Sequence, residues 1–130
     1  MPAYIYSRRI AFHETDAAGI VHFANYFRLA EEAETHALAS LAKPDTFRQY
    51  TYPRVHAEAD YHAPLRFFEK ITVTARLTRI GNSTLHWEFC ISDPAGPCAT
   101  VRCISARRHA ADASAAPYSD TERRLLESLL

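Results

Sequence analysis

Asp16 is the strongest candidate for chemistry in this chain. It is the only charged residue in a turn that continues through residues 17–21, and a helix is expected to begin soon afterwards. The free backbone N–H groups at the start of a helix bind a developing oxyanion. A carboxylate beside such donors suits acyl transfer, with Asp16 acting as a nucleophile or as a general base. Taken alone, an aspartate near a glycine more often only shapes a turn.

The elements around Asp16 follow from the pattern of apolar residues. Residues 4–13 are predicted to form a first strand, and Gly19 marks the turn that follows. Asn25 is a plausible N-cap for a helix that would end at Lys43-Pro44-Asp45. The expected buried face of this helix recurs at helical spacing and is rich in alanine: Tyr26, Ala30, Ala33, Ala37 and Leu41.

The second half of the chain is predicted to be mostly strand. Apolar and polar residues alternate over 54–63, 70–78 and 85–91, and a further strand is expected over 98–107. Turns are predicted at Gly81-Asn82 and at residues 93–97. One helix followed by antiparallel strands indicates an α+β fold, in which the sheet wraps around a single long helix.

The length of 130 residues predicts a single domain over 1–130. Within it, residues 109–118 are expected to be a loose, alanine-rich segment. Residues 119–130 are expected to form a short C-terminal helix that begins with a capping box at Ser119 and Glu122.

Charge and composition narrow the classes of partner and compartment. Fifteen basic and fifteen acidic residues cancel, so neither a nucleic acid nor a membrane is expected as a partner. The first residues do not resemble a signal peptide, and the three cysteines contain no C-x-x-C motif. A cytoplasmic location is therefore the expectation.

A polar face on the strand over 54–63 is the other cluster to consider. His56, Glu58, Asp60 and His62 share one side of that strand, and such residues can bind metals. Residues two apart on a strand are separated by about 6.6 Å, so the two histidines lie too far apart for one ion. We interpret the cluster as a polar sheet face or a subunit interface, and we predict no metal and no cofactor.

The motif D-x-x-G-I-V-x-x-x-N-Y, from Asp16 to Tyr26, resembles the 4-hydroxybenzoyl-CoA thioesterase family of hotdog-fold proteins. The resemblance implies an antiparallel sheet wrapped around one long helix, and an acyl-CoA thioesterase. In this family the aspartate attacks the thioester carbonyl or activates water, and a backbone N–H seven residues later, at Phe23 here, polarises the carbonyl oxygen. The resemblance also implies a homodimer or homotetramer with its sites at subunit interfaces.

Further site residues follow from the same resemblance. Gly19 permits close approach of the backbone, Asn25 and Tyr26 hold the start of the helix, and an acidic residue is frequent at the position of Glu31. Some relatives carry a histidine at the position of Phe23, one residue after His22. Because a neighbouring side chain can point elsewhere, His22 is either a pocket residue or a residue beside the pocket or on the surface. Side chains expected to meet coenzyme A at the pocket mouth are Arg66, Lys70, Arg79, Ser83 and Arg107 or Arg108.

The expected substrate is an aromatic or a short- to medium-chain acyl-CoA thioester, since aromatic side chains cluster near Asp16. Two alternatives remain open. A hotdog dehydratase of 3-hydroxyacyl thioesters would use a catalytic histidine, for which His22 is the available candidate. A non-catalytic acyl-CoA-binding module would keep the fold without turnover, which the presence of Asp16 disfavours.

Overall fold

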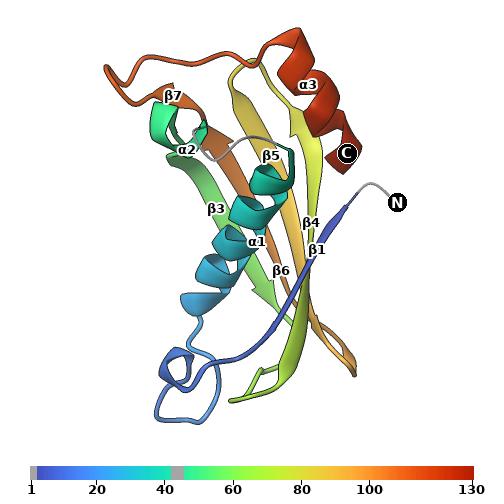
Figure 1. Ribbon diagram of the computed structural model, residues 1–130. Helices are drawn as coiled ribbons and strands as arrows, with labels where there is room; N and C mark the ends of the chain where they lie inside the picture. Colours follow the sequence, from blue (N-terminus) through green and yellow to red (C-terminus); the bar gives the residue numbers. More distant parts are fainter. Residues whose placement is uncertain (1–2, 42–45) are drawn as a thin grey trace.

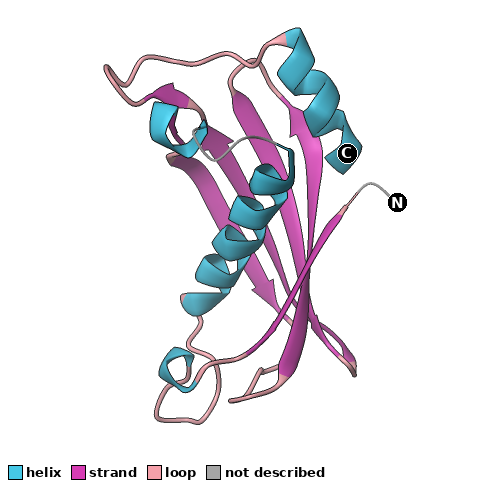
Figure 2. Ribbon diagram, in the orientation of Figure 1, coloured by secondary structure: helices cyan, strands magenta, loops and turns pink. Residues whose placement is uncertain are grey.

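Five antiparallel strands form a single sheet in the order β1-β4-β5-β6-β3, and helix α1 lies across one face of it (Figures 1 and 2). The computed structural model describes residues 3–41 and 46–130. Its elements are β1 (Tyr4–Arg9), η1 (Phe12–Glu14), α1 (Asn25–Leu41), α2 (Thr46–Gln49), β2 (Tyr50–Thr51), β3 (Arg54–Tyr61), β4 (Lys70–Ile80), β5 (Thr84–Asp93), β6 (Gly96–Ala106), β7 (Arg108–His109), α3 (Asp120–Leu126) and η2 (Glu127–Leu129).

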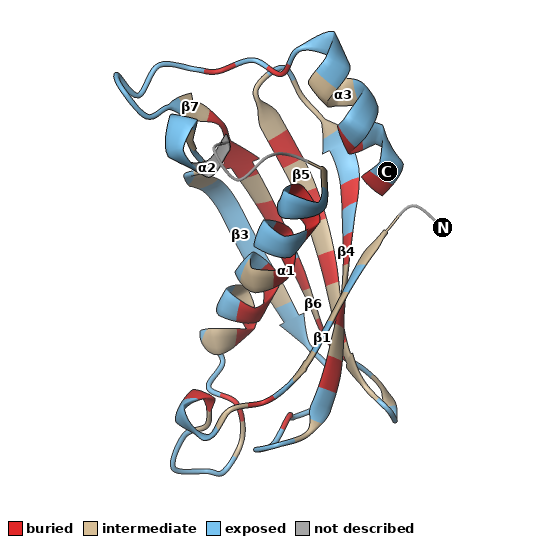
Figure 3. Ribbon diagram, viewed as in Figure 1, coloured by how far each residue is buried: buried red, intermediate tan, exposed pale blue. Residues whose placement is uncertain are grey.

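The alternation in β4 and β5 places one set of side chains against α1, and this set forms the core. Buried residues run along the centre of the sheet, whereas its edges are exposed (Figure 3). The predictions for these two strands and for the turn between them are confirmed. The buried residues that the two strands contribute are Ile71, Val73, Ala75, Leu77, Leu85, Trp87, Phe89 and Ile91.

Helix α1 packs closely on the sheet because its buried face is largely alanine. Ala30, Ala33 and Ala37 are at most 1% exposed, and Tyr26 and Leu29 extend the same face. Small side chains allow the curved sheet to approach the helix backbone. The predicted helical face is thus confirmed. The helix ends at Leu41, and the predicted stop at Lys43-Pro44-Asp45 lies outside the described residues.

The first strand is shorter than predicted, because it ends at Arg9 instead of continuing to His13. Beyond it the backbone of Ile10 still bonds to the loop before β4, accepting from the Phe68 N–H at 2.9 Å. The chain then turns into the 3-10 helix η1, where the Glu14 carboxylate accepts a hydrogen bond from the Ala11 N–H at 2.7 Å. A side chain therefore replaces the strand partner that Ala11 would otherwise need.

Strand β3 is an edge strand, and most of its apolar residues are exposed within the chain. It pairs only with β6 in the sheet order, and Val55 and Tyr61 are 60% and 47% exposed. The period of two predicted the strand correctly. It carried no information on burial, which depends on whether another element covers the face.

The C-terminal part of the chain crosses the end of the sheet and finishes on β4 (Figure 1). Within residues 109–118, Ala116 is buried, and the neighbouring β7 pairs with β2. The predicted capping box of α3 is present, with the Ser119 hydroxyl accepting from the Glu122 N–H. No helix in the described part of the chain is long and apolar enough to cross a membrane.

The observed architecture is α+β, one long helix held against an antiparallel sheet, as the sequence predicted. This architecture determines which of the predicted site residues lie close together. The loop that carries Asp16 and the first turn of α1 meet at one end of the sheet, beside the last residues of β3 (Figure 1).

Candidate active site

Asp16 sits in a tight turn that uses only part of its hydrogen-bonding capacity. Its Oδ1 accepts from the Ala18 N–H at 2.9 Å, and its backbone carbonyl accepts from the Gly19 N–H at 2.9 Å. Gly19 has a φ of +78°, which glycine adopts without strain. Within the described ranges Oδ2 has no partner, and the side chain is exposed. Asp16 is thus both a turn-forming residue and a free carboxylate.

A cleft of about 420 Å³ opens beside this carboxylate. Such a volume suits a small organic group. One wall is the Asp16 loop and the first turn of α1, and the other is the end of β3 with the residues that follow it. The residues that line it are Asp16, Ile20, Val21, Phe23, Tyr26, Tyr61, His62, Ala63 and Pro64.

The start of α1 offers a backbone donor to this cleft. The carbonyl of His22 accepts from the Asn25 N–H at 2.9 Å, and His22 Nδ1 accepts from the Ala24 N–H at 3.3 Å. Between them, the Phe23 N–H has no acceptor among the residues that the structure describes. A free N–H at a helix N-terminus is suited to binding an oxyanion.

Asn25 is not the N-cap that the sequence predicted. It is the first residue of α1, and its Nδ2 donates to the backbone carbonyl of Glu14 at 2.8 Å. The same carbonyl accepts from the His22 N–H at 3.0 Å. The Asn25 amide therefore ties the helix start to the strand-to-loop junction instead of capping the helix itself, a long-range contact that the local sequence could not reveal.

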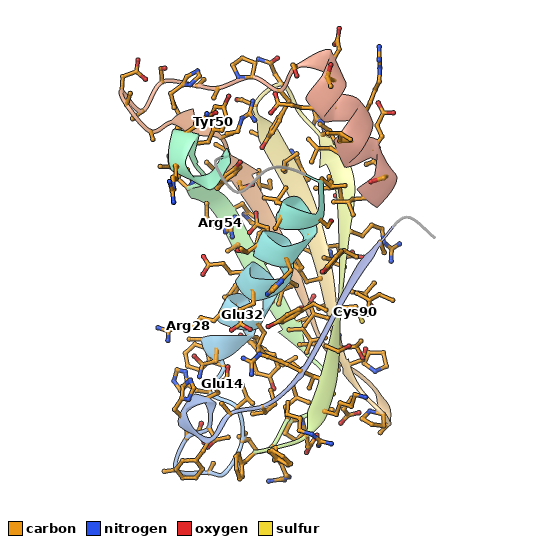
Figure 4. The ribbon with its side chains drawn as sticks, in the orientation of Figure 1. Glu14, Arg28, Glu32, Tyr50, Arg54 and Cys90 are labelled. Carbon is orange, nitrogen blue, oxygen red and sulfur yellow. The ribbon has the colours of Figure 1, made fainter. Side chains whose placement is uncertain are left out.

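Glu14 and Arg8 hold the loop from behind, although neither was among the predicted site residues. The guanidinium of Arg8 pairs with both carboxylate oxygens of Glu14, and its Nε donates to Glu32 on α1 at 2.8 Å. Glu14 and Glu32 lie near each other at the lower end of α1 (Figure 4). Burial opposes ionisation of Glu14, but the hydrogen bonds from Arg8 and Ala11 outweigh it and lower the pKa of this carboxyl.

The structure brings together three of the predicted site residues, Asp16, Phe23 and Tyr26, all of which line the cleft. Gly19 belongs to the same loop, and Asn25 supports it from behind. His22 is not among the cleft-lining residues. Its ring lies against that of Phe23 with centroids 4.5 Å apart, so it is a neighbour of the site and its role stays a prediction.

Glu31 lies apart from Asp16 within one chain. It contributes to a different hollow, of about 340 Å³, between α1 and β3, where Arg54 approaches it at 3.9 Å. Arg54 is labelled beside α1 in Figure 4, and Arg28, which also lines this hollow, projects away from the sheet. The carboxylate of Glu31 is therefore not assembled with the cleft by this chain alone.

The predicted coenzyme A contacts divide between the two ends of the sheet. The backbone of Arg66 forms an isolated β-bridge with that of Ile20, which lines the cleft. Lys70 begins β4 at the same end of the sheet. Arg79 lies near the other end of this strand, about 30 Å away at roughly 3.3 Å per residue. Ser83 follows in the next turn, so it shares that distant end.

Arg107 cannot meet a coenzyme A phosphate, which corrects its candidacy. Only 2% of the residue is exposed, because it is stacked between the rings of Tyr50 and Tyr118, at 3.9 and 4.0 Å. Its Nη1 donates to Glu122 at 2.5 Å, and its other donors reach backbone carbonyls at residues 116 and 117. The guanidinium holds the C-terminal segment in place, and each of its three nitrogens already donates within this chain.

Tyr61 and His62 line the cleft, although neither was predicted as a site residue. The Tyr61 hydroxyl donates to the Phe23 carbonyl at 2.9 Å, and the His62 ring approaches Thr100 at 3.3 Å. Both residues stand at the end of a predicted strand. The signal available in the sequence was this position, because side chains at strand ends often border sites.

The polar face of β3 is occupied by ion pairs. His56 Nε2 lies 2.8 Å from Glu58, and Arg102 on β6 pairs with Glu58, Asp60 and Glu88 at 3.8, 3.5 and 3.1 Å. No group of three potential metal ligands occurs in the ranges 3–41 and 46–130.

Residues 18–110 match the model of the thioesterase superfamily. The 1,4-dihydroxy-2-naphthoyl-CoA hydrolase of Synechococcus elongatus is 31% identical over 111 residues, which cover 80% of each chain. The residues that match the family model include the central helix and strands β3 to β6.

Solved structures share the architecture at lower identity. The 1,4-dihydroxy-2-naphthoyl-CoA thioesterase of Synechocystis superposes with a TM-score of 0.85 and 21% identity over 98% of this chain and 97% of its own. A gentisyl-coenzyme A thioesterase gives 0.85 and 23% over 94% and 98%. These likenesses show that the fold is the hotdog fold.

Proposed function

The chain belongs to the thioesterase superfamily, and we propose that it hydrolyses an aromatic or a short- to medium-chain acyl-CoA thioester to the free acid and coenzyme A. The observation that carries this proposal is the shared cleft. Among the residues that the structure describes, one carboxylate oxygen of Asp16 and the backbone N–H of Phe23, at the start of α1, have no partner, and both residues line this cleft. A nucleophile or base beside an oxyanion donor is the arrangement that acyl transfer needs.

In this proposal the thioester carbonyl oxygen faces the Phe23 N–H, and Asp16 faces the carbonyl carbon. Asp16 either attacks the carbon directly or removes a proton from a water molecule that attacks it. In both cases the C–S bond breaks and coenzyme A leaves as a thiolate. In the first case, water then hydrolyses the resulting anhydride and regenerates the carboxylate. The N–H and the helix dipole stabilise the negative charge on the carbonyl oxygen in either course.

An aromatic acyl group is the preferred substrate class within this proposal. The cleft carries the rings of Phe23, Tyr26 and Tyr61, and Phe23 is 64% exposed and available for contact. Rings of this kind pack well against a flat aromatic acyl group. The Synechococcus relative, whose name specifies a naphthoyl thioester, supports the same class.

A homodimer or homotetramer is part of the proposal. Its support is the uncovered edge strand β3, with Val55 60% exposed, and the hollow beside Glu31 that the chain leaves open. A second copy would cover these groups and bring its own Glu31 toward a neighbouring cleft. Arg66 and Lys70, at the cleft end of the sheet, are the proposed contacts for the phosphates of coenzyme A.

The experiment is thiol release from a panel of benzoyl-, hydroxybenzoyl-, naphthoyl- and straight-chain acyl-CoA thioesters. The wild type is compared with Asp16→Asn and with a matched control, Asp112→Asn. Asp112 also accepts a hydrogen bond in a turn, from the Ser114 N–H at 3.0 Å, but it lies in the C-terminal segment away from the cleft. Binding of each substrate is measured separately by calorimetry.

We expect turnover on at least one aromatic thioester, lost by about a thousandfold or more in Asp16→Asn while binding persists. Asp112→Asn should retain wild-type turnover. If the wild type binds the thioesters but releases no thiol from any of them, the chain is a binding module and the proposal fails. Hydration of an enoyl-CoA without thiol release would instead identify a dehydratase.

A further inference from the structure

Tyr61 connects the two walls of the cleft. It is the last residue of β3, and its ring packs edge-on against Tyr26 on α1, with centroids 5.0 Å apart and planes at 82°. Its hydroxyl donates to the backbone carbonyl of Phe23 at 2.9 Å, across 38 positions of sequence. The residue whose N–H is the proposed oxyanion donor is therefore held through its other peptide group by a side chain from the opposite wall.

The Phe23 carbonyl accepts this bond because the helix leaves it without its usual partner. In a regular α-helix the N–H of residue 27 would donate to the carbonyl of residue 23. Here the Phe27 N–H donates to the Ala24 carbonyl at 3.2 Å, so the first turn is tighter. The Tyr61 hydroxyl takes the place of the missing backbone donor.

The peptide before Phe23 is held by a turn whose two central residues are Phe23 and Ala24, so it depends on the peptide between them. Its carbonyl belongs to His22 and accepts from the Asn25 N–H at 2.9 Å, within the first turn. In a planar trans peptide the N–H points opposite to the carbonyl, so the Phe23 N–H is directed away from the helix interior. With Tyr61 on the following peptide, both planes that flank the Phe23 Cα are anchored, and the two soft dihedral angles of this residue are set.

The peptide after Phe23 has one other anchor, and it is weaker. The Ala24 N–H in this peptide donates to His22 Nδ1 at 3.3 Å, at the long end of hydrogen-bond distances. Without the Tyr61 hydroxyl, this side-chain contact alone would restrain the peptide. A donor that must already be aimed when charge develops loses effect when it can rotate.

We propose that Tyr61 is a positioning residue for hydrolysis: its hydroxyl locks the peptide after Phe23 and so aims the Phe23 N–H at the oxyanion. This inference rests on the proposed function of the Asp16 cleft. It assigns to the end of β3 a part in the chemical step, in addition to its place in the cleft wall.

The test is Tyr61→Phe, which removes the hydroxyl and keeps the ring that packs on Tyr26. The expected kcat for thiol release is about tenfold lower, with KM within about twofold, because the donor acts on the transition state more than on the bound thioester. In ¹H–¹⁵N spectra, the Phe23 and Ala24 amide resonances should shift. The control is Tyr50→Phe, because Tyr50 stacks on Arg107 at the other end of the sheet. The kcat of this variant should equal that of the wild type.

Replacing Tyr61 with p-aminophenylalanine restores a donor at the same ring position and should return kcat to within about threefold of the wild type. It also keeps the test decisive if Tyr61→Phe is poorly folded. An unchanged kcat in Tyr61→Phe, with an active wild type, would overturn the role of Tyr61 alone. So would a raised KM with unchanged kcat, which would make Tyr61 a substrate contact. A wild type without thiol release would overturn the proposed function instead.

Discussion

At the cleft end of the sheet, Asp16 accepts one hydrogen bond through one carboxylate oxygen, and the neighbouring Phe23 N–H has no acceptor in the described part of the chain. At the opposite end, Arg107 is 2% exposed and every nitrogen of its guanidinium donates. Figure 4 labels Tyr50, which stacks on that guanidinium, far along the sheet from Glu14. Asp16 and the Phe23 N–H therefore keep free hydrogen-bonding capacity, whereas every nitrogen of the Arg107 guanidinium is already engaged.

The same contrast separates two carboxylates that are only two residues apart. Glu14 is buried and is paired with Arg8 and the Ala11 N–H, whereas Asp16 is exposed and nearly unpaired. A saturated polar group stabilises the fold, since removing one partner leaves the other buried without compensation. A polar group with free capacity is available to a substrate. The two kinds of region should therefore respond to mutation in opposite ways.

Arg107→Met should produce the largest loss of stability. It removes the hydrogen bonds from Arg107 to the Glu122 carboxylate and to two backbone carbonyls, together with two ring contacts, so we expect about 3 kcal/mol of destabilisation. For a chain of this size that lowers Tm by about 10 °C. Turnover at 25 °C should stay within about twofold of the wild type. Thermal unfolding and thiol release on the same preparation measure both.

Arg108→Met is the adjacent control, because within residues 3–41 and 46–130 the Arg108 side chain makes only a long contact, at 3.4 Å, with the Ala113 carbonyl. Its stability should change by about 0.5 kcal/mol or less. If Arg107→Met lost turnover without losing stability, Arg107 would belong to the active site. That result would contradict the proposed difference between the two ends of the sheet.

Arg8→Met should have an intermediate effect of about 2 kcal/mol, because charged hydrogen bonds to Glu14 and Glu32 are lost. Here we expect turnover to fall several-fold as well, since Arg8 holds the loop from which Asp16 projects. Arg9→Met, one residue along β1, keeps those bonds and should leave turnover unchanged. Equal turnover in Arg8→Met and wild type would show that the Glu14 anchor supports the fold without positioning the loop.

The pH dependence of stability should reveal the contribution of the ion pair between Arg107 and Glu122. Hydrogen bonds from Arg107 lower the pKa of Glu122 to about 2, from an ordinary 4.5. Because the pKa is depressed in the folded state, the ionised carboxylate stabilises the protein above about pH 4.5. That contribution is lost as the pH falls from about 4.5 toward 2. Thermal scans in this window should show a smaller decline in Glu122→Gln than in the wild type, and parallel declines would contradict the assignment.

Gly19→Ala should destabilise the protein less than Arg107→Met or Arg8→Met, by about 1 kcal/mol, because φ is +78° but the new methyl group meets no atom within 4 Å. The strain falls on the turn that presents Asp16, so turnover should also drop. Gly96→Ala, at φ +140° in the first residue of β6, is the matched change away from Asp16 and should lower stability alone. Denaturant titration with thiol release separates the two outcomes.

Local patterns were enough to predict the strands whose inner faces are covered and a helix start close to Asp16, whereas the pairing of Asp16 with Phe23 came from the family resemblance. They failed where a distant group competes for a polar atom. Asn25 bonds to the carbonyl of Glu14, 11 residues earlier, and so does not cap the helix. Tyr61 reaches the carbonyl of Phe23, and alternation along β3 says only which face it shares.

The dependence on distant groups also explains why the sequence could not sort the basic residues that were predicted to contact coenzyme A. Arg66, Lys70 and Arg79 are alike in sequence, but β4 carries the last of these to the opposite end of the sheet. Arg107 looks like a surface charge until the rings of Tyr50 and Tyr118 close over it. Such assignments depend on tertiary neighbours, which residue types and spacing do not specify.

Turnover and Tm of Asp16→Asn, measured together on one preparation with the best aromatic thioester, test the central claim most directly. The free carboxylate is proposed to do chemistry and to contribute little to the fold. The predicted result is a kcat lower by about a thousandfold or more, with Tm within about 2 °C of the wild type. A kcat within about tenfold of the wild type, or a Tm as low as that of Arg107→Met, would contradict the account.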